Sequence, residues 1–82
     1  MSDTLARVKR VAAEVLKIDP AKVKDNSHFV RDLGAESVQG VELVAAFEAE
    51  FEIDMEEDAA LAVKTIGDAA KFIDNVIAQK KK

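Results

Sequence analysis

The chain has 82 residues, about half of them apolar and a third charged, which fits one small soluble domain over residues 1–82 with a thin core. The absence of cysteine excludes disulfides and thiolate metal sites. No apolar stretch approaches the roughly 20 residues of a membrane span or resembles a signal peptide, so we expect a cytoplasmic protein. The net charge of −4 conceals a middle block, residues 32–63, with ten acidic and no basic residues. This negative surface disfavours nucleic acid and favours a protein partner with a basic patch.

The first predicted element is an amphipathic helix over residues 4–16, in which apolar residues recur every three or four positions. Ser2 or Asp3 is placed to cap its start. Pro20 and the DNS cluster then interrupt helical periodicity, so residues 17–36 are predicted as a long loop, with a short helical turn at PAKV. Five apolar residues are expected to pin this loop to the helices: Ile18, Val23, Phe29, Val30 and Leu33.

The second predicted helix is SVQGVELVAAFEAEF, residues 37–51. Its core face is formed by apolar residues spaced by three and four positions: Leu43, Val44, Phe47 and Phe51. Gly40 lies inside this helix, where glycine costs about 1 kcal/mol relative to alanine. Close approach of another group to the backbone is the one reason that the sequence offers for it.

A short helix is predicted within residues 52–63, capped by Asp54, and a last helix within residues 65–82, capped by Thr65. The lysines at 80–82 suit the negative end of the helix dipole, although we expect a disordered basic tail there rather than a binding site. No segment has the pattern of a strand. The sequence therefore predicts an all-α four-helix bundle with three longer helices, one short helix and a long loop between the first two.

Ser37 follows a glycine turn and begins the second long helix. A serine nucleophile needs a base within reach, and the single histidine, His28, is expected to be structural or exposed, so a serine hydrolase is disfavoured. Two interpretations remain. Ser37 caps the helix, or it carries a phosphate ester, which the positive end of the helix dipole would favour. The acidic run EIDMEED lacks the spacing and glycine of an EF-hand, so no metal site is expected.

The segment FVRDLGAESVQGVELVAAFEAEF resembles the attachment-site segment of acyl carrier proteins. DLGAES is followed by VELV and by an acidic, Phe-ended helix, and the likeness extends over residues 1–80. It implies a 4'-phosphopantetheine group on Ser37, with Glu36 assisting attachment by a phosphopantetheinyl transferase. A monomeric, non-enzymatic carrier would then hold acyl groups as thioesters for enzymes of fatty-acid or related lipid and polyketide biosynthesis.

The resemblance also implies two surfaces. Partner enzymes with basic patches would contact an outer face of the second helix, at Glu42, Glu48, Val38, Val41 and Ala45. The acyl cargo would be sheltered in the interior, among Leu43, Val44, Phe47, Phe51, Val63 and Ile66.

Several residues depart from the family's pattern. Glu36 replaces the Asp and Val38 replaces the Leu of the usual Asp-Ser-Leu motif. Gln39 and Ala49 stand where many relatives have acids. These changes indicate a specialised carrier, or else an unmodified, degenerate relative, and leave the cargo, the partners and the transferase open. The alternative is an acidic helical protein-interaction module in which Ser37 is a plain helix cap.

Overall fold

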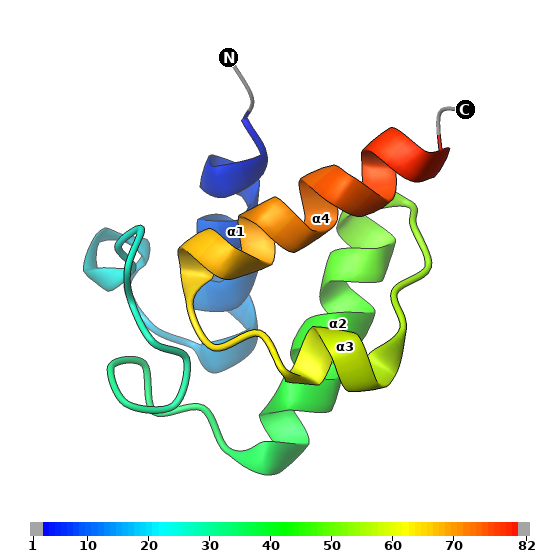
Figure 1. Ribbon diagram of the computed structural model, residues 1–82. Coiled ribbons are helices and arrows are strands. Elements are labelled where there is room, and N and C mark those ends of the chain that lie inside the picture. Colours follow the sequence, from blue (N-terminus) through cyan, green and yellow to red (C-terminus); the bar gives the residue numbers. More distant parts are fainter. Residues whose placement is uncertain (1–2, 81–82) are drawn as a thin grey trace.

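The computed structural model describes residues 3–80, and it contains four α-helices and one short 3-10 turn (Figure 1). In chain order these are α1 (Thr4–Leu16), η1 (Pro20–Lys22), α2 (Ser37–Phe51), α3 (Glu57–Leu61) and α4 (Ile66–Lys80). The predicted all-α arrangement of three longer helices, one short helix and a long first link is confirmed. No helix within residues 3–80 is long and apolar enough to cross a membrane.

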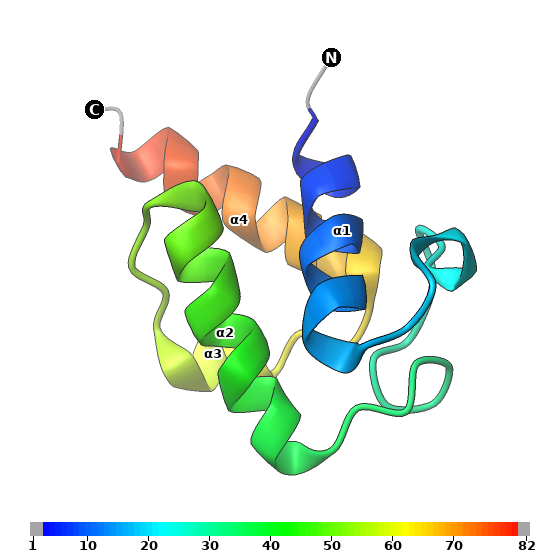
Figure 2. The same cartoon turned by 180° about the vertical axis from the view of Figure 1, so that it is seen from behind.

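Helix α1 lies against both α2 and α4, and α4 crosses in front of it in Figure 1 and behind it in Figure 2. Its buried face includes Val8, which is fully buried, as are Ile66 and Ile73 of α4. The helix ends at Lys17, whose left-handed backbone lets its N–H donate to the Ala13 carbonyl. These contacts place the core between the three longer helices.

Of the three predicted caps, one is found, one is wrong and one falls partly outside the described residues. Asp3 occupies the N-cap position of α1, but its side chain makes no capping hydrogen bond, while Ser2 lies outside the described residues. Helix α3 starts after Glu56 rather than at Asp54. At the start of α4, the Thr65 hydroxyl oxygen accepts a hydrogen bond from the Asp68 N–H at 3.2 Å, as its spacing predicts.

The long link is pinned by its apolar residues, as predicted, with one exception. Val23 and Phe29 are buried, and Ile18 and Leu33 pack against the core. Val30 is 62% exposed, so the expectation that it pins the loop is wrong. It lies in the turn before Gly34, whose N–H donates to the Val30 carbonyl at 3.2 Å.

Backbone hydrogen bonds tie the same link to the segment between α3 and α4. The Phe29 N–H donates to the Lys64 carbonyl at 2.9 Å, and the Ile66 N–H donates to the Ser27 carbonyl at 3.0 Å. This pair of bonds closes an isolated antiparallel bridge between His28 and Thr65. The loop is therefore held in place just before it delivers the chain to Ser37.

At the other end, Lys80 is the last residue of α4, and its ammonium group donates to the Glu52 carbonyl at the end of α2. Of the predicted tail at 80–82, residues 81 and 82 lie outside the described part of the chain.

Candidate functional site

Ser37 is the first helical residue of α2, and its side chain is exposed. The N-cap is Glu36, whose extended backbone (φ −96°, ψ 167°) gives way to helical geometry at Ser37. The Gln39 side-chain oxygen accepts a hydrogen bond from the Glu36 N–H at 2.9 Å, as in one half of a capping box. Ser37 is therefore not the cap, and within residues 3–80 no group hydrogen-bonds to its hydroxyl.

The turn before Ser37 needs a glycine. Gly34 has a φ of +72°, a left-handed conformation that glycine adopts without steric cost. The turn buries Ala35, whose N–H donates to the Phe29 carbonyl at 2.8 Å. Because Ala35 is anchored and Glu36 is exposed, the chain reaches the surface at Ser37.

His28 is used inside the loop and does not serve Ser37. Its ring Nδ1 accepts hydrogen bonds from the N–H groups of Val30 and Arg31, each at 3.2 Å. Its own backbone N–H donates to an Asp32 carboxylate oxygen at 2.7 Å. The histidine thus holds the turn that carries Val30 and Gly34, which agrees with the structural role expected of it.

An apolar cavity of about 590 Å³ opens beside Ser37, between the long link, α2 and α3. Glu36 and Ser37 lie on its wall, and Met55 and Leu61 line it from the segment that follows α2. Its full lining comprises Phe29, Val30, Ala35, Glu36, Ser37, Gly40, Leu43, Val44, Phe47, Met55, Ala60, Leu61, Val63 and Ala69. The site therefore combines an exposed hydroxyl with an adjoining apolar space.

Four of the six residues predicted to shelter an acyl chain are in this lining: Leu43, Val44, Phe47 and Val63. The other two are elsewhere. Phe51 is buried at the far end of α2, where the Arg7 guanidinium carbon lies 4.4 Å from the centre of its ring. Ile66 is fully buried in the core at the start of α4. Sequence periodicity places a residue on the core face of a helix, but it does not say which stretch of that face borders a cavity.

Sequence reasoning missed the part of the lining that comes from the long link and from α3. Phe29 was expected only to pin the loop, and Leu61 was not singled out at all. The interior glycine at position 40 was the signal for Leu61, since a Cβ atom there would lie 3.2 Å from a methyl carbon (Cδ2) of Leu61. The expected close approach to the Gly40 backbone is thus found.

The residues predicted to meet partners fall into two groups. Val38 is 64% exposed and Val41 48% exposed, and Glu42 and Ala45 are exposed as well. Glu48 is half-buried, and its carboxylate accepts a hydrogen bond from the Met55 N–H at 2.8 Å. Glu48 therefore stabilises the link between α2 and α3, a role that local sequence does not reveal.

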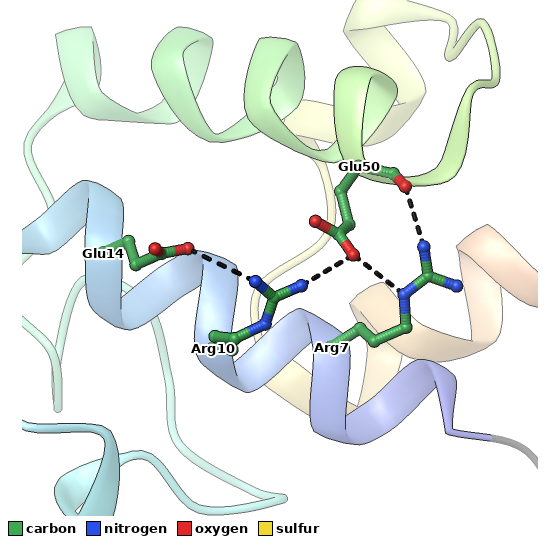
Figure 3. A network of polar contacts seen from close by, with 4 residues as sticks. All are labelled: Arg7, Arg10, Glu14 and Glu50. Atoms are coloured by element: carbon green, nitrogen blue, oxygen red, sulfur yellow. Dashed lines mark hydrogen bonds and ion pairs between the residues drawn. The ribbon is translucent and has the colours of Figure 1, made fainter.

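A second acid of α2 is also held internally. One Glu50 carboxylate oxygen accepts hydrogen bonds from the guanidinium groups of Arg7, at 2.8 Å, and Arg10, at 2.7 Å (Figure 3). The Arg7 guanidinium also donates to the Glu50 backbone carbonyl at 2.8 Å. The hydrogen bond from Arg7 lowers the pKa of Glu50, partial burial opposes that effect, and the charge of Arg10 adds to it. This network joins α1 to the end of α2 that lies farthest from Ser37.

The geometry fits an attached phosphate ester. The Ser37 hydroxyl is exposed and has no hydrogen bond to any residue from 3 to 80, and it stands at the positive end of a 15-residue helix. The apolar space beside it provides shelter for a group of low polarity. Within residues 3–80 the His28 imidazole accepts hydrogen bonds from loop N–H groups at Nδ1, and no hydrogen bond joins it to Ser37.

Comparison with known proteins identifies the family. The family described as "Phosphopantetheine attachment site" matches residues 6–73 of the chain. An acyl carrier protein of Phenylobacterium zucineum (strain HLK1) is 52% identical over 73 residues, which cover 89% of this chain and 92% of the relative. An acyl carrier protein of Caulobacter vibrioides (strain NA1000 / CB15N) is also 52% identical, over 89% of this chain and 94% of the relative. The chain belongs to the acyl carrier protein family.

Proposed function

We propose that Ser37 is the residue of this carrier to which 4'-phosphopantetheine is attached, and that the cavity beside it shelters the acyl cargo. The observation that carries the proposal is the position of the exposed Ser37 hydroxyl, at the positive end of α2 and on the wall of the apolar cavity. Both the phosphate ester and the acyl chain would meet a favourable environment there.

Membership of the family makes the protein a carrier rather than an enzyme. The phosphopantetheine group supplies, when bound, a terminal thiol that holds acyl groups as thioesters. The residues of the chain bind this group, expose the point at which it is attached and protect the acyl cargo from water. Ser37 anchors the group, the N-terminus of α2 stabilises its phosphate, and the side chains of Leu43, Phe47 and Met55 exclude water from the cargo.

We further propose that partner enzymes contact exposed acidic and apolar side chains of residues 36–45. The exposed Glu36 and Glu42 would attract basic patches on the transferase and on acyl-handling enzymes of fatty-acid or related lipid biosynthesis, while Val38, Val41 and Ala45 would supply apolar contacts. Such electrostatic attraction speeds encounter while leaving exchange fast, as a carrier that visits several enzymes requires. Glu48 contributes less, because its carboxylate is occupied by the Met55 N–H.

The test is the intact mass of the purified protein after incubation with coenzyme A, magnesium and a promiscuous phosphopantetheinyl transferase. We expect the wild-type protein and the control variant Ser2→Ala to gain the mass of one phosphopantetheine, and Ser37→Ala to gain none. An unmodified but folded wild-type protein, with the transferase active on a known carrier, would overturn the proposal. A gain that persists in Ser37→Ala would place the attachment elsewhere.

A further inference from the structure

Gly40 and Leu61 meet on the wall of the cavity, one from α2 and one from α3. A Cβ atom on Gly40 would lie only 3.2 Å from Cδ2 of Leu61, which is closer than an ordinary carbon–carbon contact. Ser37 precedes Gly40 by three residues, about one helical turn, and lines the same cavity. The contact is therefore one turn away from the attachment residue.

One partner of this contact is unfavourable in its own helix, and the other is partly exposed. Glycine inside a helix is less stable than alanine, and Gly40 lies in the fourth position of α2. Leu61 leaves 41% of its surface exposed at the end of a five-residue helix. Because Gly40 lies on the wall of the cavity, a glycine that weakens its helix there is expected to have a functional reason.

Space supplies that reason. Because Gly40 has no side chain, the Leu61 side chain can lie directly on the backbone of α2 and close the side of the cavity between α2 and α3. An alanine at position 40 would push the leucine outward by a few tenths of an ångström or project its own methyl group into the lining. The size and the cover of the cavity at this point therefore depend on two residues.

We propose that Gly40 and Leu61 are specificity-determining residues, which together determine the length of acyl chain that the cavity retains. Leu61 covers the chain from the α3 side, and Gly40 provides the room that the cover and the chain share. This inference rests on the proposed attachment at Ser37, because only a chain tethered there would enter the cavity beside Gly40.

The experiment loads each protein with a series of saturated acyl chains, from butyryl to tetradecanoyl, transferred as acyl-phosphopantetheine from the corresponding acyl-coenzyme A. The increase in the folding equilibrium constant is then measured against the same protein bearing phosphopantetheine alone. This reference cancels the effect of each substitution on the unloaded protein. For wild type we expect an increase of about fourfold for each methylene that becomes buried, until the cavity is full.

Gly40→Ala should change the limiting chain length, whereas Leu61→Ala should change the increase per methylene. Gly40→Ala adds one carbon to the lining, so the longest chain that still adds stability should shorten by about one methylene. Leu61→Ala removes the cover, so the increase should fall to about twofold per methylene as half of each methylene regains contact with water. Leu5→Ala, a half-buried leucine of α1 outside the lining, is the matched control and should show the wild-type increments.

Intact mass distinguishes a failure of attachment at Ser37 from a failure of the role proposed for Gly40 and Leu61. If wild type gains no acyl-phosphopantetheine, the attachment at Ser37 is wrong and this inference falls with it. If all proteins load fully, but Leu61→Ala and Gly40→Ala give the same increments and the same limiting chain length as wild type and Leu5→Ala, the attachment stands and the role of Gly40 and Leu61 is overturned.

Discussion

At the start of α2, capping and attachment fall to different residues. Gln39 accepts the Glu36 N–H, whereas the Ser37 hydroxyl has no hydrogen bond within the described residues. We therefore expect Ser37→Ala to change the free energy of unfolding by less than about 0.5 kcal/mol, as for other surface substitutions. Gln39→Ala should lower it by about 1 kcal/mol, through the loss of one hydrogen bond. Urea unfolding followed by circular dichroism measures both.

The same pair of variants tests the rival interpretation of Ser37 as a plain cap. A cap residue replaced by alanine loses about 1 kcal/mol. If Ser37→Ala shows that loss and Gln39→Ala does not, the hydroxyl caps the helix in solution and the structural basis for a free attachment residue is removed. Equal small effects in both variants would show that the Gln39 hydrogen bond contributes little.

At the scale of helices, the sequence predicted what depends on near neighbours. The bounds of α2 follow from a glycine turn on one side and from the end of the apolar spacing after Phe51 on the other, so residues 37–51 were predicted and found. The predicted N-cap of α3 is wrong because several acids compete there, and propensity alone does not rank Asp54 against Glu56.

The cavity was only partly predictable, for a different reason. Its α2 residues Leu43 and Phe47 follow from helical spacing, but Phe29 joins them only because the long link folds back and bonds to Lys64. Likewise, Glu48 looks like a free acid in the sequence, and its bond to the Met55 N–H depends on how the chain leaves α2. Contacts of this kind are set by the path of a loop, which periodicity does not encode.

The hydrogen bonds from α1 to Glu50 of α2 make the free energy of unfolding depend on pH. Hydrogen bonding from Arg7 lowers the folded-state pKa of Glu50 below its ordinary value of 4.5, against the opposing effect of burial and with help from Arg10. A lowered folded-state pKa means that the charged form stabilises the fold at pH values above 4.5. That contribution is lost as the pH falls from the ordinary value through the lowered one.

We therefore expect Glu50→Gln to be less stable than wild type at neutral pH, and the two proteins to converge as the pH falls below 4.5. Urea midpoints across this range measure the difference. Glu14→Gln is the matched control, because Glu14 is exposed and lies 4.0 Å from the same Arg10, where a surface ion pair contributes little. A difference between Glu50→Gln and wild type that stays constant into acid would show that Glu50 acts through packing and not through its charge.

At the scale of the whole molecule, the acidic block of residues 32–63 acts as one charge distribution. Glu48 and Glu50 are held by internal hydrogen bonds, but the other acids of the block are exposed, and the block has no basic residue. The radius of gyration is 11.6 Å, close to the screening distance of about 10 Å in 0.1 M salt. At lower salt, these charges repel one another across the entire domain, which destabilises the compact state.

Added sodium chloride should therefore raise the melting temperature, and magnesium should do so at lower concentration because a divalent ion neutralises paired acids directly. Screening also weakens the ion pairs that Arg7 and Arg10 form with Glu50, but pairs near the surface contribute little, and the half-buried Glu50 is screened less. Repulsion among the many exposed acids outweighs that loss.

The variant Asp54→Asn/Glu56→Gln, which removes two exposed charges of the block, should melt higher than wild type in low salt and match it in high salt. A melting temperature that both titrations leave unchanged would mean that the acidic surface costs the fold nothing, and that its charge serves partner encounter alone.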